Sequence, residues 1–359
     1  MQNIRAQVHL PTTALAADIG FFKSLGLRMD RIFPADNPRT AVFSGHGLRL
    51  RLDVSDAPAG TIAILADDPV LIAGGATELT APGGTRVLIE PLDPPLVMPP
   101  TEHAFVTRRL ADQAPWVVGR AGMHYRDLVP SRLGGAVIAS HIRIPQGGPV
   151  PDMVHFHKVG FQLIFCVKGW VDVVYEDQGE PIRLFAGDCF IQPPEIRHRV
   201  LFASDGIEVI EIGVPAEHVT EIEHDMALPT SQLRPDREWQ GQRFVHNVAA
   251  GAEWGASRLP GYDARDTTIS ANTKGVAGVT VLRPSGLPPT WTAHDADILF
   301  SFVMSGGLTL QGGEKDGQRL AAGDAFVIPP GLETRYLDPT HDLELLEVAL
   351  PGVFHTSVS

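Results

Sequence analysis

The alternation of apolar and polar residues changes character near residue 115. Before that point, residues 14–27 carry apolar side chains near helical spacing, which predicts a helix. Three later segments have strand character: 39–44, 48–54 and 85–90. We therefore expect residues 1–98 to form a small α+β module, followed by a Pro-rich linker over residues 99–116.

Beyond residue 115 the helical periodicity largely disappears, and short apolar segments such as AVIASHIRI, FQLIFCVKG and RVLFAS follow one another. Their spacing of about ten residues, with Gly and Pro between them, is typical of a β-sandwich or barrel. The chain contains 36 Gly and 30 Pro. This excess favours many short strands joined by tight turns over a helical bundle. We expect a mainly β protein.

The β-rich part contains an internal duplication. The segment AGDCFIQPPEIRHRV (186–200) aligns with AGDAFVIPPGLETRY (322–336). Four pairs of residues match at one offset of 136: Gly187 with Gly323, Pro193 with Pro329, Glu211 with Glu347, and Pro215 with Pro351. Repetition at a fixed period indicates repeated structural units. We predict two tandem β-barrels, over residues 117–225 and 251–359, joined by a connector over residues 226–250.

Charge and composition exclude several classes of function. The formal net charge is −13, and the 29 Lys and Arg residues form no long run, so a nucleic-acid groove or a patch for anionic membranes is not expected. The two cysteines, Cys166 and Cys189, cannot form a disulfide framework and fit a reducing compartment. The sequence shows no signal-peptide pattern and no apolar stretch of the roughly 18 residues that span a bilayer. We expect a cytoplasmic protein.

The candidate chemistry lies in the segment PDMVHFHKVGFQ. His155 and His157 are two residues apart, so a strand places both imidazoles on one face. His198 follows the turn QPPEIRHRV. Three neutral imidazoles that converge inside a barrel are suited to a divalent first-row metal. Gln162 lies five residues after His157, so a bend, for which Gly160 is the candidate, must intervene before its amide oxygen joins them.

These residues resemble the two motifs of the cupin superfamily. The first motif, G-x5-H-x-H-x3-4-E-x6-G, has these counterparts, with a longer first gap and Gln in place of Glu: Gly148, His155, His157, Gln162 and Gly169. The second motif, G-x5-P-x-G-x2-H-x3-N, has these counterparts, with Glu and Phe at the Gly and Asn positions: Gly187, Pro193, Glu195, His198 and Phe202. The resemblance covers roughly residues 117–355 and implies two jelly-roll barrels, called a bicupin.

The resemblance further implies one divalent first-row metal ion per chain, Fe(II) above Zn, Mn or Ni, held by His155, His157, His198 and Gln162. The second copy departs from the motifs. Aligned by its glycine with the first copy, it carries these residues at the four ligand positions: His294, Ala296, Phe300 and Thr334. One possible ligand of four does not hold a metal tightly. We expect this barrel to be structural or to contribute to a homodimer.

Other residues are candidates for the surroundings of the metal. If the strand face of Arg143 points inward, Arg143 pairs with a substrate carboxylate; otherwise it is a surface or salt-bridged arginine. Gln192 and Cys166 are candidates for the same cavity, although Cys166 fits a small buried apolar residue better. His218 and His224 stand beside four acids, which we interpret as an exposed acidic segment rather than a second metal site.

The N-terminal module resembles one βαβββ unit of the vicinal oxygen chelate (glyoxalase-like) superfamily. The DIGFFKSLGL helix and the closing GTRVLIEP strand carry this likeness. In that family the metal ligands lie on the first and last strands, and these positions correspond to His9 and Glu90. A working site needs two such modules face to face. One module alone implies a site shared in a dimer, or a packing domain without metal.

The cupin resemblance implies a metal-dependent enzyme with a small-molecule substrate, anionic ones included. The leading hypothesis is an Fe(II) dioxygenase that cleaves a C–C bond of a chelating enolate or hydroxy acid. Arg143 would anchor a carboxylate, and Gln162 would be a weak ligand or a hydrogen-bond donor. Two alternatives stay open: a non-oxidative isomerase or lyase acting on a sugar- or keto-acid-derived substrate, and a non-catalytic bicupin that binds a small ligand.

Overall fold

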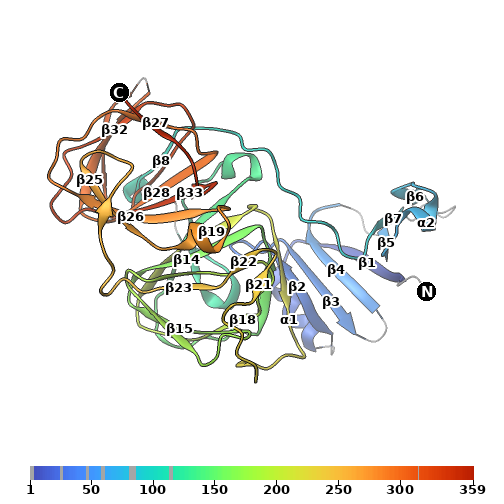
Figure 1. Ribbon diagram of the computed structural model, residues 1–359. Helices are drawn as coiled ribbons and strands as arrows, with labels where there is room; N and C mark the ends of the chain where they lie inside the picture. The colour runs from blue at the N-terminus through green and yellow to red at the C-terminus, as the bar shows by residue number, and fades with distance from the viewer. Residues whose placement is uncertain are drawn as a thin grey trace. The chain divides into compact units, whose positions relative to one another are not determined.

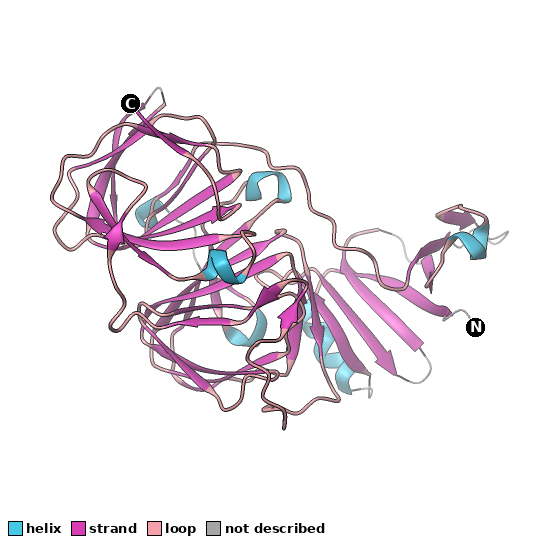
Figure 2. Ribbon diagram, viewed as in Figure 1, coloured by secondary structure: helices cyan, strands magenta, loops and turns pink. Residues whose placement is uncertain are grey.

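The computed structural model describes residues 4–24, 27–45, 48–57, 61–80, 86–112, 116–313 and 315–359. Within these ranges the chain is mainly β, as the sequence predicts, and its α-helices are short (Figure 2). Residues 25, 26 and 85, which belong to two predicted elements, lie outside the described residues. Contacts divide the chain into two compact units. The N-terminal unit contains Met1–Val97, Met153–Lys158 and Glu217–Met226, and the two-barrel unit contains the remainder.

The N-terminal unit is built on a mixed β-sheet (Figure 1). Its first part has βαβββ order, with strand order β2-β3-β4-β1 and with β1 parallel to β4. A second part follows, in which β5 is antiparallel to β1 and parallel to β7. The elements are β1 (Ile4–Thr12), α1 (Leu15–Ser24), β2 (Arg28–Phe33), β3 (Thr40–Gly45), β4 (Leu48–Val54), β5 (Thr61–Ala66), α2 (Val70–Ala73), β6 (Glu78–Thr80) and β7 (Arg86–Pro91).

Strand β2 was not predicted, and its irregular register gives the reason. The pairing of β2 with β3 shifts between Met29 and Arg31, so the buried positions Met29 and Ile32 are three residues apart. A bulge of this kind breaks the two-residue period by which strands are recognised. Helix α1 covers one face of the sheet, where Leu15 packs in an apolar cluster with Phe43 and other strand residues.

Two strands from the middle of the sequence extend this N-terminal sheet. Strand β20 (Val219–Ile222) pairs on one side with β2 and on the other with β13 (His155–Lys158). Arg31 Nε lies 2.6 Å from Glu221 Oε1, and Lys158 Nζ lies 3.5 Å from the same oxygen. The strand that carries the histidine pair therefore belongs to the same compact unit as residues 1–97.

The first barrel has a seven-stranded sheet in the order β23-β17-β14-β19-β11-β10-β9, together with a shorter group of strands around β15. Short 3-10 turns at Arg120–Gly122 and Arg132–Gly135 precede β10 and β11. The strands are β9 (Val117–Val118), β10 (His124–Asp127), β11 (Ile138–Ile144), β12 (Gly148–Pro149), β14 (Phe161–Lys168), β15 (Trp170–Tyr175), β16 (Ile182–Phe185), β17 (Cys189–Ile191), β18 (His198–Ala203) and β19 (Ile207–Val214).

The second barrel repeats this architecture in sheets of seven and five strands. Its elements are β24 (Gly255–Ala256), β25 (Tyr262–Asp266), α3 (Ile269–Asn272), β26 (Gly278–Pro284), β27 (Thr292–His294), β28 (Ile298–Ser305), β29 (Gly307–Gly312), β30 (Lys315–Ala321), β31 (Ala325–Ile328), β32 (Thr334–Leu337), β33 (Glu344–Leu350) and β34 (Thr356–Val358). The structure thus confirms two tandem jelly-roll barrels preceded by an α+β module.

The segments predicted as linker and connector also carry strands. Strand β8 (Val106–Arg108), before the first barrel, pairs with β31 of the second barrel. In the same way β23 (Val245–Asn247), before the second barrel, pairs with β17 of the first barrel. Between the barrels, the connector also forms a small hairpin of β21 (Glu238–Trp239) and β22 (Gln242–Arg243), and Leu110–Asp112 form a 3-10 turn after β8. Each barrel is therefore completed by the segment that precedes the other one.

The two barrels share an apolar core and a matched pair of arginine contacts. Phe165 and Ile210 of the first barrel belong to the same buried cluster as Phe302 of the second. Arg126 on β10 donates to the carbonyl of Gly323 at 2.8 Å, and Arg265 on β25 donates to the carbonyl of Gly187 at 2.8 Å. Gly187 and Gly323 occupy equivalent positions in the two barrels. The two arginine contacts are therefore equivalent as well.

Candidate metal centre

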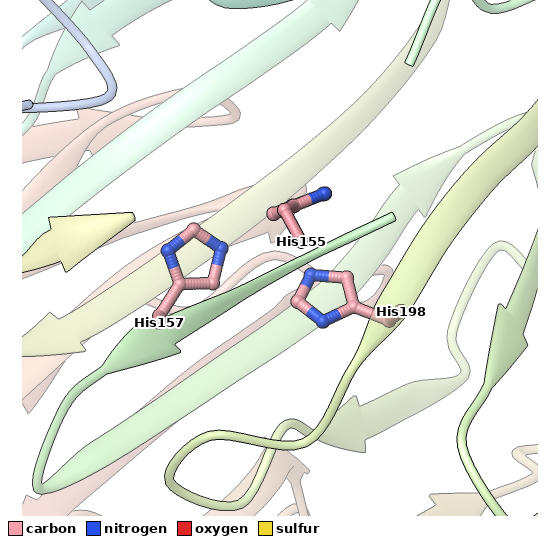
Figure 3. A group of neighbouring side chains, drawn as sticks. All are labelled: His155, His157 and His198. Atoms are coloured by element: carbon pink, nitrogen blue, oxygen red, sulfur yellow. The ribbon is translucent and has the colours of Figure 1, made fainter. Parts of the chain in front are cut away.

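The histidine pair lies on one face of β13, as the two-residue spacing predicts. Side chains along β13 alternate between buried and partly exposed, and both His155 and His157 are buried. Their ring centroids are 5.1 Å apart, with the ring planes nearly perpendicular. Figure 3 shows the two imidazoles together with that of His198.

His198 begins strand β18 directly after a tight turn. Within this turn Glu195 has a φ of 67°, in the left-handed region that favours glycine. This position is the one at which the second cupin motif has Gly, so the backbone conformation persists although the residue has changed. The turn brings His198 to the pair: one ring nitrogen of each histidine lies within 4.8 Å of the others. All three side chains are buried.

A hydrogen bond at Nδ1 orients each of the three rings. Nδ1 of His155 lies 2.7 Å from the carbonyl of Met153, and Nδ1 of His198 lies 3.0 Å from the carbonyl of Ile196. Nδ1 of His157 lies 3.0 Å from the hydroxyl of Thr220, on the neighbouring strand β20. Metal-binding histidines use one ring nitrogen as ligand and fix the ring through the other. The arrangement therefore assigns ligation to Nε2 in all three rings.

The protonation state of His198 fits the same role. The pKa of His198 is lowered to about 4, mainly by burial and also by the charge of Arg120, against the opposite effects of the Ile196 carbonyl and Asp152. A histidine with such a pKa is neutral at pH 7. Since only the neutral imidazole offers a lone pair to a cation, His198 is ready to bind metal without first losing a proton.

Gln162 lies on β14, beyond the predicted bend at Gly160, which separates β13 from β14. Its side chain is 1% exposed, and Nε2 donates to Glu211 Oε1 at 2.6 Å. The amide oxygen Oε1 is buried and has no hydrogen-bond partner among the described residues. A buried acceptor without a hydrogen-bond partner lowers the stability of the folded protein, unless a group that is not part of the chain, such as an ion, satisfies it. The three imidazoles fit a divalent cation, and the unsatisfied amide oxygen of Gln162 is a candidate for a further ligand.

The face of β14 that carries Gln162 lines the interior of the first barrel. Cys166, on the same face, belongs to the core cluster that contains Tyr175. The ring of Tyr175 in turn stacks on that of His198, with centroids 5.6 Å apart. Gln192, the other amide predicted for this cavity, donates to Tyr175 Oη at 3.0 Å. Burial raises the pKa of the Cys166 thiol to about 12, so this cysteine is a neutral core residue.

Arg120 was not predicted, and it is the arginine whose charge acts on His198. It pairs with the buried carboxylate of Asp152, whose Oδ2 accepts from the backbone N–H of Val200 at 3.0 Å. Glu211 also acts on the Arg120 guanidinium. The duplication points to Glu211, which matches Glu347, but it carries no signal for Arg120 itself.

The structure does not bring Arg143 together with the three histidines. Arg143 lies on the face of β11 opposite Ile142, and Ile142 packs in the core of the first barrel. Its guanidinium carbon lies 4.3 Å from the centroid of the Trp116 ring. The position of Arg143 therefore gives no support to a carboxylate anchor in this cavity.

The segment around His218 and His224 is partly a strand inside the sheet of the N-terminal unit and partly exposed. Strand β20 occupies most of it, His218 is buried, and its ring centroid lies 5.5 Å from that of His157. Nε2 of His224 contacts the carbonyl of Met29 at 2.7 Å. The prediction of an exposed acidic segment holds for Glu217, His224 and Asp225, whereas the residues of β20 itself alternate between buried and partly exposed.

The second barrel lacks the three-histidine arrangement. Gln162 pairs with Gly213, and Leu299 pairs with Ala349, the residue 136 positions after Gly213. The counterpart of Gln162 is therefore Leu299, not Phe300, because β28 is offset by 137 residues. The same offset places Thr292 and His294 at the positions of His155 and His157, so that His294 takes the second ligand position, not the first.

His9 and Glu90, predicted from the oxygen chelate resemblance, lie on β1 and β7, which are separated by β5. Nε2 of His9 lies 3.0 Å from the amide nitrogen of Gln7, and Nδ1 lies 3.9 Å from Asp53 Oδ2. The GTRVLIEP strand does not close the βαβββ part, which ends with β4. Among the described residues, the histidines of the first barrel form the only group of three or more potential His, Cys, Asp or Glu ligands.

Comparisons with known proteins agree with this architecture. Residues 140–212 match the family model of the cupin domain. The barrels have the cupin fold. Among solved structures, oxalate decarboxylase from Lactobacillus farciminis is similar at 12% identity and a TM-score of 0.52, covering 73% of this chain and 91% of that one. Salicylate 1,2-dioxygenase from Pseudaminobacter salicylatoxidans is similar at 15% identity and a TM-score of 0.52, with 73% and 90% covered.

A mutant oxalate decarboxylase from Bacillus subtilis is similar to this chain at 14% identity, with a TM-score of 0.50 and coverage of 72% and 81%. At such identities the likeness concerns the fold. No curated protein matches the sequence. In the described part of the chain, no helix has both the length and the apolar character needed to cross a membrane.

Proposed function

We propose that this cupin protein is an Fe(II)-dependent dioxygenase whose metal ion is bound in the first barrel. The observation that carries the proposal is the set of three buried imidazoles, each fixed by a hydrogen bond at Nδ1 and with ligand nitrogens within 4.8 Å of one another. His155, His157 and His198 would hold the ion, and Gln162 Oε1 would be a weak fourth ligand. Fe(II) in such a site supplies O2 chemistry and open positions for a chelating substrate.

The charge of the ion favours an anionic substrate. Imidazole and amide ligands are neutral, so they leave the double positive charge of the ion uncompensated. The guanidinium of Arg120 acts on His198, but the carboxylate of Asp152 pairs with it, so the excess of positive charge comes from the ion. Two of the structural neighbours are named for oxalate and salicylate, both carboxylic acids. We therefore propose a small hydroxy acid or enolate as substrate, with Arg120 in the role predicted for Arg143.

The interior of the first barrel would also hold protons in place. Burial raises the pKa of Tyr175 well above its ordinary value, so its hydroxyl keeps its proton while accepting from Gln192. Aromatic and aliphatic side chains surround this hydroxyl, among them Phe190 and Phe244. An apolar wall of this kind excludes water and strengthens the electrostatic interactions inside it.

Metal analysis and oxygen consumption test the proposal. Protein purified without added metal should contain one iron per chain. It should consume O2 with a member of a panel of hydroxyaromatic acids and β-diketones. Turnover under strict anaerobiosis with Zn or Mn bound would show instead the non-oxidative isomerase or lyase. Absence of turnover, with thermal shifts on adding panel compounds, would show the non-catalytic binding protein. The predicted homodimer and cytoplasmic location stay predictions.

The ligand assignment is tested by one substitution and a matched control. His157→Ala removes one of three imidazoles, so bound metal should fall below about a tenth of the wild-type content. His294→Ala changes the histidine at the equivalent position of the second barrel and should leave the metal content unchanged. Elemental analysis and circular dichroism of both variants give the comparison. Full metal occupancy in the His157→Ala protein would contradict the assignment.

A further inference from the structure

The inner face of the second barrel encloses a cavity of about 330 Å³. Strands β24, β25, β26 and β33 line it, together with the chain around Phe354. This volume lies within the range of small-ligand pockets. Thr292, Leu299 and Thr334 replace three of the four metal ligands in this barrel, and the cavity is lined by other residues of its inner face.

In the second barrel, a buried ion pair replaces the hydrogen bond that Gln162 and Glu211 form in the first barrel. Glu347, the duplicate of Glu211, is 3% exposed and lines the cavity. In the first barrel Glu211 accepts from the amide of Gln162, whereas Leu299 offers no such donor. Arg258 supplies it instead: Nε donates to Glu347 Oε1 at 2.8 Å, and Nη2 donates to Oε2.

His294 adds a buried acceptor without a donor. Nε2 lies 3.1 Å from the carbonyl of Ile328, to which it donates, while Nδ1 is buried and has no hydrogen-bond partner among the described residues. The ring packs against Phe354, a lining residue, with centroids 6.1 Å apart. Burial, and next the charge of Arg258, lower the pKa of His294, so the ring is neutral and Nδ1 accepts.

The charges of the lining decide the class of ligand. The lining contains three carboxylates, those of Glu253, Asp266 and Glu347, and one guanidinium, that of Arg258. This excess of negative charge disfavours an anion. A small cation is also disfavoured, because Arg258 already occupies the polar end and lies over the Phe354 ring. A hydroxyl group both donates and accepts hydrogen bonds. It can donate to His294 Nδ1 or to Glu347, and it can accept from Arg258.

We propose that the second barrel is a metal-independent binding site for a small, neutral, polyhydroxylated molecule of about monosaccharide size. Its hydroxyls would meet Glu347, Arg258 and His294. Its carbon skeleton would pack on the apolar part of the wall, which includes Ala264, Leu282 and Phe354. The site acts independently of the metal centre proposed for the first barrel.

Calorimetric titration of the full-length protein with xylose, glucose, erythritol and inositol tests this site, with putrescine and succinate as charged counterparts. At least one of the four polyols should bind one per chain, and neither charged compound should bind. Ala256→Trp fills the exposed mouth of the cavity, and Glu347→Gln removes the carboxylate. Each change should weaken the binding of that polyol at least about tenfold, the effect of losing one good contact.

The His157→Ala variant separates this proposal from the function proposed for the first barrel. It should lose metal and bind the polyol as wild type does, whereas Ala256→Trp should lose the polyol and keep its metal. Since Ala256 is exposed, this substitution tests the site even if Glu347→Gln does not fold. Failure of all four polyols to bind, preferential binding of putrescine or succinate, or unchanged binding by Ala256→Trp would each overturn the proposal.

Discussion

At the scale of single residues, Thr220 connects the metal centre to the N-terminal unit. Thr220 is fully buried on β20, and its hydroxyl holds Nδ1 of His157. Met153 and Ile196 orient the other two rings through backbone carbonyls close by in sequence. The orientation of His157 thus depends on a side chain from another strand. We regard Thr220 as a positioning residue, because it acts through His157.

Replacement of Thr220 by valine should weaken metal binding, because the variant keeps the shape of the side chain but removes the hydroxyl. Loss of a hydrogen bond to a metal-bound histidine costs roughly 10–100-fold in affinity. Competition with a chromophoric chelator measures this change. Thr220→Ser restores the hydroxyl and should recover affinity. Equal affinities of the valine variant and the wild type would contradict the role of Thr220.

His141 gives the fold a pH dependence that can be assigned in sign. It is buried between the barrels, where Nδ1 lies 2.6 Å from Arg126 Nη2 and Nε2 lies 2.8 Å from Glu208 Oε2. Its ring also contacts Trp116 and Phe302. Burial lowers the pKa of His141, and Arg126 adds to this effect, although the hydrogen bond to Glu208 opposes it.

The free energy of unfolding should therefore fall as the pH drops below about 6.5, because the unfolded state takes up a proton that folded His141 refuses until lower pH. Below the folded pKa the contribution of His141 becomes constant. Urea denaturation between pH 7.5 and 5 measures the slope. His141→Gln should be less stable at pH 7.5 and have a shallower slope. If wild type and variant lose stability in parallel, the assignment to His141 is wrong.

At the residue scale, the sequence predicted that His155 and His157 share a strand face, whereas it left the direction of Arg143 open. His155 and His157 share a face because a strand alternates, and this needs no knowledge of the rest of the fold. The inward or outward direction of Arg143 depends on which face of β11 meets the core, and a sequence with apolar residues on both faces does not decide this. Arg120 lies in an irregular turn, where no periodicity applies.

At the scale of elements, the barrels are joined by a reciprocal pair of arginines. Arg265 is 3% exposed and donates to Asn247 Oδ1 at 2.9 Å as well as to the Gly187 carbonyl. Arg126 is similarly buried and donates a hydrogen bond to the Gly323 carbonyl. Each arginine therefore satisfies a carbonyl in the turn before a core strand of the opposite barrel.

Substitution of Arg265 or Arg126 by methionine should each lower the free energy of unfolding by about 2–4 kcal/mol, because a buried carbonyl loses its donor. Denaturant titration measures the loss. Arg199→Met, at an exposed position of β18, is the matched control and should change stability by less than about 0.5 kcal/mol. Wild-type midpoints for both buried variants would show that these contacts do not join the barrels.

The duplication predicted the elements better than their exact register. Short apolar segments at regular spacing identify strands of the barrels, and the offset of 136 residues identifies their repetition. Strand β28 is offset by 137 residues, but the predicted alignment paired Gly169 with Gly307, an offset of 138, and so moved the predicted counterpart of Gln162 by one position. Gly306, which shares the positive φ of Gly169, is the glycine at the offset of 137. Strands β8 and β23 have three residues each, too few for a periodic pattern.

At the scale of the whole molecule, the compact units are not consecutive stretches of sequence. By their contacts, residues 153–158 and 217–226 belong to the N-terminal unit, although we predicted all of them but residue 226 inside the first barrel. Pairing of Arg31 with Glu221 joins segments far apart in sequence, and local patterns carry no information on such partners. The N-terminal unit therefore supports the strand that carries two of the proposed ligands.

The exchange of strands between barrels has a consequence for how the polypeptide is made. During translation β8 emerges from the ribosome early, whereas its partner β31 emerges only when most of the second barrel has been synthesised. Until then β8 has no strand to pair with, and the pairing that forms late joins residues far apart in the sequence. Folding of such a topology is slow and vulnerable to aggregation. We expect the newborn chain to depend on chaperones until translation ends.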